Sequence, residues 1–431
     1  MATWVQRHWD PSFDAPSRAD RRGGRYLAYL PDRLSSRPLI LSSELAGRAL
    51  VVEAAVRDLA GTAGANGLEG LARFLLRSEA IASSKIEGLQ VSSQQIALAE
   101  LAQSDETITK GFTATAQLVA NNITALRQAA STLATAPTVT IEGINGLHRA
   151  LLPDERHRDL RTVQNWIGGS DWHPVNAQFV PPPETLVTEL MDDLCEYING
   201  GLHAPLVQAA LVHAQFETIH PYADGNGRVG RALIHTVLVR RGLTTSALLP
   251  ISLVLLTRSQ DYLAGLTGYR HEGAADLPAA HQAAAEWLAM FLEATAVAVD
   301  QAKQFAAEVA ELTHEWTARL AKHRATTGVR GMPRADSATA RLLARLPEVP
   351  VLTARTVERA LGVSFPAART ALEELADAGV LHRKSVDRQT TGYQAREVLD
   401  LLTFAERRLA STKWDTRQSK PQRHVPARPT T

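Results

Sequence analysis

One stretch of twelve residues, His220 to Arg231, constrains the chain more than any other. Its sequence, HPYADGNGRVGR, brings together a histidine, an aspartate, an asparagine, three glycines and two arginines. An apolar pattern at helical spacing precedes it from Pro205, and a second one follows it as far as Gly242. The sequence therefore predicts two helices joined by a glycine-rich loop that leads into the N-terminus of the second helix.

Such a junction is suited to bind an anion. Free backbone N–H groups and the positive end of the helix dipole meet there, and glycine lets the backbone approach a ligand closely. Arginines three residues apart share a helix face and can hold phosphate oxygens. Aspartate suits a Mg²⁺ ion that arrives with a polyphosphate, and histidine, with a pKa of about 6.5, can deprotonate a hydroxyl. A solvated turn with surface arginines is the alternative.

The twelve residues resemble the HxFxDGNGRxxR signature of the Fic family, with Tyr222 where phenylalanine is usual. A buried tyrosine there would need a partner for its hydroxyl. The resemblance implies a mainly α fold, in which a helical Fic core carries a small β-hairpin flap. It also implies a protein adenylyltransferase, which transfers AMP from ATP to a Ser, Thr or Tyr hydroxyl of a target protein and can modify itself.

The resemblance also implies a role for each site residue. His220 would deprotonate the target hydroxyl, Asn226 would contact the α-phosphate, Asp224 would bind Mg²⁺, and the two arginines would hold the β- and γ-phosphates. Tyr262 and Tyr269 would border adenine and ribose, although aromatic residues at this spacing are usually core. The implied site comprises His220, Asp224, Asn226, Arg228 and Arg231 for catalysis, and Gly225, Gly227, Tyr262 and Tyr269 for nucleotide binding.

A second motif lies upstream, where Ser83, Glu87 and Gly88 form the pattern SxxxEG. It resembles the inhibitory motif of Fic proteins that carry their inhibitory helix within the same chain. The resemblance implies that Glu87 pairs with Arg231 and occupies the guanidinium meant for the γ-phosphate, so that ATP binds in a non-productive pose. Two alternatives are a helix end with a solvated glutamate, and removal of AMP from a target by a water that Glu87 positions.

A β-hairpin is predicted between the helices and the catalytic loop. Thr162 to Ile167 is β-prone, Gly168 to Asp171 has turn residues, and Ala177 to Val180 precedes three prolines. The segment 162–180 is similar to the flap of Fic proteins, which lies over the active site and aligns a target segment by strand addition. A purely structural hairpin is the alternative.

The remaining patterns are mostly helical. Residues 1–40, with four prolines, are predicted to form an irregular arm. Near the C-terminus, two short helices and two strands are typical of a winged helix-turn-helix, with Ser364 as the N-cap of the recognition helix. Predicted helices cover Ser43–Gly61, Leu71–Ile81, 111–135, 139–152, 283–294, 296–325, Thr353–Leu361 and Ala367–Ala378, and the predicted wing strands cover Val380–Arg383 and Gly392–Ala395.

The predicted winged helix indicates a competing function, that of a DNA-binding regulator that uses the Fic core as a nucleotide sensor. Arg369, Arg383, Lys384 and Arg388 could meet DNA phosphates, although nearby acidic residues oppose them and such modules also dock partners. The predicted domains are 1–110 (N-terminal region with the inhibitory helix), 111–295 (Fic core), 296–330 (linker helix), 331–400 (winged helix) and 401–431 (basic disordered tail).

Composition limits the location and partners of the chain. A formal net charge of +1 provides no global attraction to nucleic acid or membrane, and one cysteine, Cys195, allows no intramolecular disulfide. Because no stretch resembles a signal peptide or a membrane span, we expect a cytoplasmic protein without membrane contact. The expected ligands are ATP and Mg²⁺ and the expected partner is a target protein; a homodimer is left open by the family resemblance.

Overall fold

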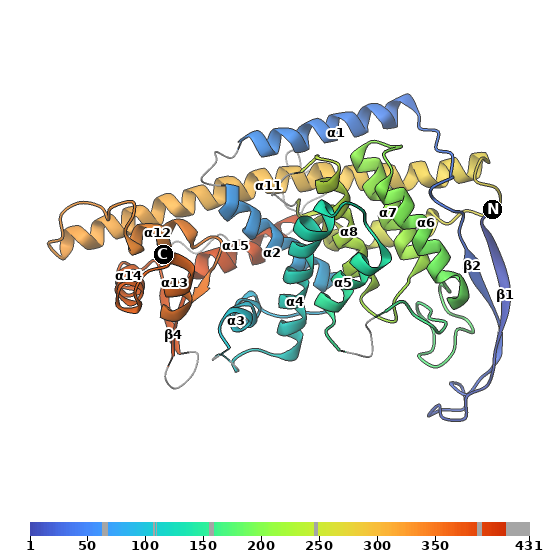
Figure 1. Ribbon diagram of the computed structural model, residues 1–431, viewed down its shortest axis with the longest axis horizontal. Helices are drawn as coiled ribbons and strands as arrows, with labels where there is room; N and C mark the ends of the chain where they lie inside the picture. The colour runs from blue at the N-terminus through green and yellow to red at the C-terminus, as the bar shows by residue number, and fades with distance from the viewer. Residues whose placement is uncertain are drawn as a thin grey trace. The chain divides into compact units, whose positions relative to one another are not determined.

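The computed structural model describes residues 1–62, 68–106, 108, 110–154, 159–244, 249–385 and 390–410. The fold is mainly helical with small antiparallel sheets, which confirms the predicted fold class (Figure 1). Two compact units divide the chain, and helices α1, α4 and α11 contribute residues to both. The first unit contains residues 1–56, 124–244 and 258–294, and the second contains 57–123, 245–257 and 295–431.

The first unit holds the predicted catalytic loop between two buried helices. Every residue of α7 from Leu206 to Ile219 is buried, as is α8 from Asn226 to Leu238, and the two helices pack against each other (Figure 1). Helices that are apolar around most of their circumference belong in a core. The elements are β1 (Thr3–Trp9), β2 (Gly24–Leu30), α1 (Ser43–Thr62), η1 (Ala129–Leu133), α5 (Ile141–Leu151), η3 (Glu184–Leu186), α6 (Val187–Asn199), α7 (Pro205–Ile219), α8 (Asn226–Arg240), α10 (Ser259–Gly268) and α11 (Pro278–Thr326).

The N-terminal segment differs from the predicted irregular arm. Strands β1 and β2 form an antiparallel hairpin, in register from Thr3 opposite Leu30 to Trp9 opposite Gly24. Prolines had suggested irregular structure, but they lie in the connection between the strands and after β2, where no ladder hydrogen bond is required. The backbone N–H of Tyr29 in β2 donates to the carbonyl of Val180, 2.9 Å away, so the hairpin borders the predicted flap.

The predicted helices are present, but several of their ends differ from the predicted ones, and two of them are continuous. The two patterns at 283–294 and 296–325 form the single 49-residue helix α11, because neither glycine nor proline interrupts the chain between them. Two of the C-terminal helices have side-chain N-caps, and Ser364 is the one that the sequence predicts. Thr353 caps α13 and Ser364 caps α14, each accepting a hydrogen bond from a backbone N–H three residues further on.

The second unit contains a three-stranded antiparallel sheet in the order β3-β5-β4. Helices precede and follow its strands in the order expected of a winged helix, and α15 extends beyond the predicted boundary at 400. The elements are α2 (Leu68–Ile86), α3 (Ser93–Ser104), α4 (Ala114–Gln128), α9 (Ile251–Thr257), α12 (Ala338–Arg345), β3 (Val351–Leu352), α13 (Ala354–Leu361), α14 (Phe365–Asp377), β4 (His382–Ser385), β5 (Thr391–Gln394) and α15 (Arg396–Ala410).

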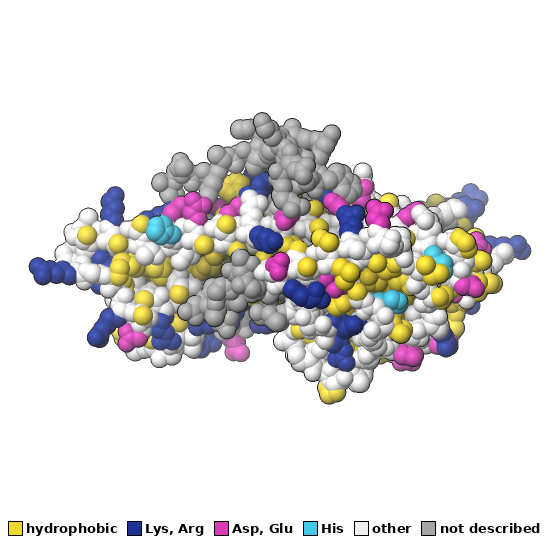
Figure 2. Space-filling view, turned by 90° about the horizontal axis from the view of Figure 1, so that it is seen from above, with side chains coloured by type: hydrophobic (Ala, Val, Ile, Leu, Met, Phe, Trp, Pro, Cys, Tyr) yellow, Lys and Arg dark blue, Asp and Glu magenta, His cyan; other side chains and the backbone are white. Residues whose placement is uncertain are grey.

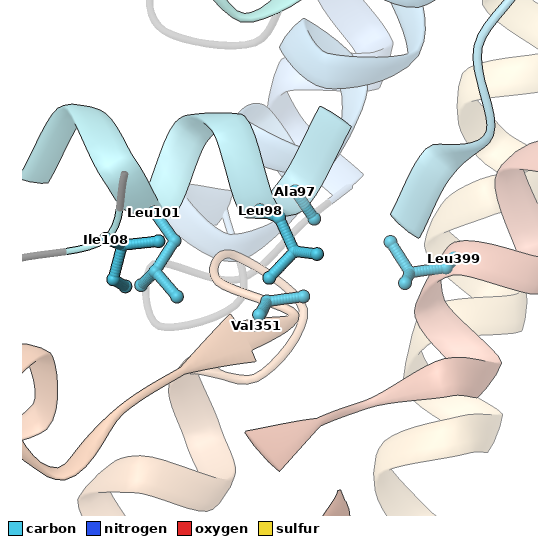
Figure 3. Close-up of a cluster of buried hydrophobic side chains, with 6 residues drawn as sticks. All are labelled: Ala97, Leu98, Leu101, Ile108, Val351 and Leu399. Atoms are coloured by element: carbon cyan, nitrogen blue, oxygen red, sulfur yellow. The ribbon is translucent and has the colours of Figure 1, made fainter. Parts of the chain in front are cut away.

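Helix α3 shares a hydrophobic cluster with this C-terminal module (Figure 3). The side chains come from α3, the turn after it, β3 and α15: Ala97, Leu98, Leu101, Ile108, Val351 and Leu399. In the same unit, Arg383 of β4 forms ion pairs with Glu373 and Asp377. This arginine is therefore engaged by carboxylates, and DNA contact by the module stays a prediction. Arg388 and the tail 411–431 lie outside the described residues.

Charged side chains of both signs are interspersed on the face seen in Figure 2, in line with the near-zero net charge. Among the described helices, none combines the length and the apolar character that crossing a lipid bilayer requires.

Candidate active site

His220 lies at the C-terminal cap of α7, in a backbone conformation that is unusual for a residue other than glycine. Its φ of 49° and ψ of 61° belong to the left-handed region. The carbonyl of His220 accepts hydrogen bonds from Arg161 Nε at 2.9 Å and from Asn165 Nδ2 at 3.1 Å. Strained backbone of this kind persists where the surroundings hold it in place. These contacts therefore fix the direction in which the histidine leaves the helix.

Arg161 is buried and connects several parts of the site. Besides the carbonyl of His220, its guanidinium donates to the carbonyls of Pro182 at 2.6 Å and Val163 at 3.2 Å, and its backbone N–H donates to Pro221 at 2.8 Å. Burial lowers the pKa of Arg161 to about 10, which leaves the guanidinium charged at neutral pH. The sequence alone gives no signal for this role, because it depends on the carbonyls of Pro182 and His220, which are distant along the chain.

The predicted hairpin at 162–180 is reduced to one bridge. Ile167 pairs with Phe179, with the N–H of Ile167 donating to the carbonyl of Phe179 at 2.8 Å. Before Ile167, the side chains bind carbonyls of other segments. Gln164 donates to Pro181, and Asn165 donates to His220 and to Tyr222. The segment therefore anchors the catalytic loop.

Asn226 closes the catalytic loop on itself. Its Oδ1 accepts from the backbone N–H of Tyr222 at 2.8 Å, and its Nδ2 donates to the carbonyl of the same residue at 2.7 Å. Gly225 precedes it with a φ of 82°, which glycine adopts without a steric penalty. A side chain at Gly225 would also meet Leu151 and Leu152 at about 3.1 to 3.2 Å. The contact of Asn226 with an α-phosphate stays a prediction that competes with this pair of hydrogen bonds.

Tyr222 is fully buried, and its hydroxyl has the partner that burial requires. The hydroxyl donates to Asn145 Oδ1 at 2.8 Å, and the ring stacks on His148 with centroids 3.9 Å apart and an interplanar angle of 7°. His148 Nε2 lies 2.9 Å from the carbonyl of Asp224. Helix α5 thus supports the loop through two polar side chains that the sequence analysis did not identify.

The Tyr222–Asn145 hydrogen bond should be measurable as a coupling energy. We expect Tyr222→Phe to lower the free energy of unfolding by about 1–2 kcal/mol, because it leaves a buried amide oxygen without its donor. A double-mutant cycle with Asn145→Ala in urea unfolding should give a coupling of about 1 kcal/mol. Additive effects of the two substitutions would contradict the assignment.

Asp224 carries the exposed carboxylate of the loop. Its side chain is 62% exposed, and Oδ1 accepts from the N–H of Gly225 at 2.6 Å and lies 3.6 Å from Arg228 Nη2. Among the described residues, no group of three or more His, Cys, Asp or Glu side chains could hold a metal by itself. An exposed carboxylate beside a glycine-rich loop fits Mg²⁺, which takes one or two protein oxygens and completes its shell with phosphate and water.

The two arginines of the motif are buried to an extent that is uncommon for this residue type. Arg228 is 4% exposed and Arg231 is 1% exposed, both within the first two turns of α8. Their positive charges add to the positive end of the helix dipole at the loop. The site thus places a histidine, an exposed carboxylate and two buried cations around one helix N-terminus, an arrangement suited to a polyphosphate.

Tyr262 and Tyr269 are core residues in this structure. Tyr262 donates to or accepts from His213 Nε2 at 2.8 Å, and the hydroxyl of Tyr269 donates to Gln215 Oε1 at 3.3 Å. Both residues are buried, so contact with adenine and ribose would require the surroundings to open, and that role stays a prediction. Burial, reinforced by the charge of Arg231, lowers the pKa of His213 from 6.5 to about 3.

This shift predicts an acid sensitivity of folding. Because the folded pKa of His213 lies below the unfolded value, the unfolded chain takes up the proton first, and stability present above pH 6.5 is lost as the pH falls toward 3. Between pH 7 and pH 5 this histidine alone should cost about 2 kcal/mol. Urea unfolding of His213→Gln should show a pH-dependent loss smaller by that amount. Identical losses in variant and wild type would refute the expectation.

The inhibitory motif lies at the end of α2, in the second unit. Ser83 is buried in the helix, which ends at Ile86, and Glu87 follows on the surface. Gly88 has a φ of 79°, and its N–H donates to the carbonyl of Lys85 at 2.9 Å, as in a left-handed helix cap. The motif therefore has a defined local structure, and the inhibitory role of Glu87 stays a prediction.

The fold is a helical one in which a glycine-rich loop leads into the N-terminus of a buried helix. Residues 138–238 match the family model described as Fic/DOC family, and residues 53–131 match that of the Fic/DOC family N-terminal region. These two segments of the chain belong to the Fic family.

Curated relatives and a solved structure are similar to parts of the chain. A probable protein adenylyltransferase of Aquifex aeolicus is 38% identical over 79 residues, which cover 18% of this chain and 25% of the relative. A protein adenylyltransferase of Caenorhabditis elegans is 29% identical over 131 residues, covering 29% and 23%. The matched regions thus span about a quarter of each relative. A Fic family protein from Desulfovibrio desulfuricans aligns with a TM-score of 0.48 at 22% identity, covering 84% of this chain and 98% of that one.

Proposed function

We propose that this chain is a protein adenylyltransferase, which transfers AMP from ATP to a hydroxyl of a target protein. The observation that carries the proposal is the arrangement of the loop between α7 and α8. His220 stands at its entrance, and Arg228 and Arg231 are buried at the helix N-terminus that follows. The matching relatives described as protein adenylyltransferases support it.

In this proposal, the chain binds and orients the triphosphate before the transfer. The backbone N–H groups at the start of α8, together with Arg228 and Arg231, neutralise the phosphates, and Asp224 holds Mg²⁺, which would supply further charge neutralisation when bound. His220 accepts the proton of the target hydroxyl as its oxygen attacks the α-phosphorus. The bond to the β-phosphate oxygen breaks, and pyrophosphate leaves.

The segment 162–180 is the proposed docking place for the target protein. The bridge between Ile167 and Phe179 leaves most of its backbone outside any β-ladder, and the side chain of Val163 is exposed. An extended target segment could therefore add main-chain hydrogen bonds here. Arg161 and Asn165 connect this segment directly to the backbone of His220, which couples target docking to the position of the base.

Glu87 is the proposed restraint on the activity. A carboxylate that competes with the γ-phosphate for Arg231 would keep ATP in a non-productive pose. We therefore expect Glu87→Gly to raise AMP incorporation at least about tenfold, corresponding to the loss of about 1.4 kcal/mol of competing interaction. The measurement is incorporation of label from α-³²P-ATP into the protein itself and into a cell lysate. Glu189→Gly, at an exposed glutamate of α6, serves as the control.

An unchanged rate in the Glu87→Gly variant would remove the inhibitory assignment and leave the transferase assignment standing. Absence of label in both proteins, with ATP binding retained, would count against the transferase itself.

A further inference from the structure

A buried carboxylate lies one helical turn before the proposed base. Glu217, in the last turn of α7, is 7% exposed, and its Oε2 lies 3.9 Å from Nδ1 of His220. That separation exceeds hydrogen-bond length but is within the range of charge attraction. Catalytic hydrogen bonds are often long in the absence of substrate and shorten when it binds. Glu217 is thus close enough to attract a proton on Nδ1 of His220.

The position of the Glu217 carboxylate depends on a glycine in the neighbouring helix. A Cβ atom at Gly230 of α8 would meet Glu217 Oε1 at 2.5 Å and the ring of Phe216 at 3.0 Å. Only a residue without a side chain therefore lets the carboxylate lie against the backbone of α8. The observed position of the Glu217 carboxylate therefore requires a glycine at position 230.

Arg270 interacts electrostatically with the same carboxylate. Burial lowers the pKa of Arg270 to about 10, and the negative charge of Glu217 acts in the opposite direction by favouring the charged guanidinium. The Arg270 guanidinium carbon lies 3.4 Å from the centroid of the Phe179 ring, in the segment 162–180. Glu217 therefore interacts electrostatically with a positive group and lies beside the proposed base.

We propose that Glu217 is a positioning residue for His220. A carboxylate beside Nδ1 favours the tautomer in which Nδ1 carries the proton, and Nε2 then presents its lone pair to the target hydroxyl. The Arg270 guanidinium stabilises the negative charge that this requires. The inference rests on the proposed adenylyl transfer for its catalytic consequence, while the tautomer itself is a property of the protein without substrate.

The test combines a tautomer measurement with kinetics. In protein labelled with ¹⁵N-histidine, the His220 signals are identified by their loss in His220→Ala, and wild type should show the Nδ1-protonated form. Glu217→Met, which keeps the length of the side chain, should shift His220 toward the other tautomer. When Glu217→Met is combined with Glu87→Gly, kcat for AMP transfer should fall about 10- to 100-fold, and KM for ATP should stay unchanged. Glu217→Gln, which retains an acceptor, should restore part of kcat.

A His220 tautomer ratio unchanged in both variants, or a kcat within about twofold of the parent, would overturn the proposal. If Glu217→Met does not fold, the proposal is tested by the His220 tautomer ratio and the kcat of Glu217→Gln alone. The tautomer measurement needs no activity, so its outcome is independent of the transferase assignment. A chain that shows the expected tautomer shift but transfers no AMP would refute the proposed function and keep the role of Glu217 in orienting the ring.

Discussion

In the Glu87→Gly background, His220→Ala should lower the rate of AMP incorporation by a factor of about 100 or more. A positioned general base contributes about 10²- to 10⁴-fold to such reactions, and alanine cannot accept the proton of the attacking hydroxyl. The loss should fall on kcat, because the groups proposed to bind the triphosphate are the α8 N-terminus and the two arginines. The measurement is initial-rate kinetics with α-³²P-ATP as substrate.

A matched control is available in the same unit. His8 is a histidine of β1 with a side chain 62% exposed, and His8→Ala should leave the rate within about twofold of the parent. ATP binding, measured by calorimetry, should persist in His220→Ala. A His220→Ala variant that incorporates AMP at the parental rate would show that another group, or solvent, removes the proton.

Arg161→Met should reduce the free energy of unfolding by about 3 kcal/mol or more. The substitution removes charge-assisted hydrogen bonds to the carbonyls of His220, Pro182 and Val163, and each buried acceptor left without a donor costs about 1–3 kcal/mol. Relief from burying a charge offsets part of this loss, which is why the expected total is below the sum. The measurement is urea unfolding at pH 7.

The appropriate comparison for Arg161→Met is an arginine on the surface. Arg33, whose side chain is 60% exposed, forms an ion pair with Glu189, and Arg33→Met should change stability by less than about 1 kcal/mol. AMP transfer by folded Arg161→Met should also fall, because the backbone of His220 loses one of its two side-chain donors. Equal stability changes in the two variants would mean that the network around Arg161 does not hold the loop.

The parts of the fold that the sequence predicted correctly are those with local signals. The helices around the loop between α7 and α8 follow from apolar spacing, and Ser364 caps α14 because its hydroxyl accepts from an N–H group three residues further on. The N-terminal hairpin was missed because prolines outweighed the pairing of β1 with β2, which joins residues from Trp9 and Gly24 out to Thr3 and Leu30 across a long connection. Strand pairing of this kind has no local signature.

The candidate site also contains residues that the sequence predicts and residues that only the folded chain brings together. The motif from His220 to Arg231 lies in one continuous stretch, so its anion-binding character could be predicted from residue types alone. Arg161, Glu217 and Arg270 act through carbonyls, rings and charges that only the packed chain brings near. Tyr222 shows the intermediate case, because its need for a partner was predictable and the identity of that partner, Asn145, was not.

The central claim is that the loop directs attack to the α-phosphorus of ATP. It is tested most directly by incubating the Glu87→Gly protein in parallel with α-³²P-ATP and γ-³²P-ATP, followed by intact-protein mass spectrometry. The account predicts label from the α-position only, an added mass of one AMP group, and loss of both signals in the Glu87→Gly/His220→Ala double variant. Label from the γ-position with the added mass of one phosphate would contradict it.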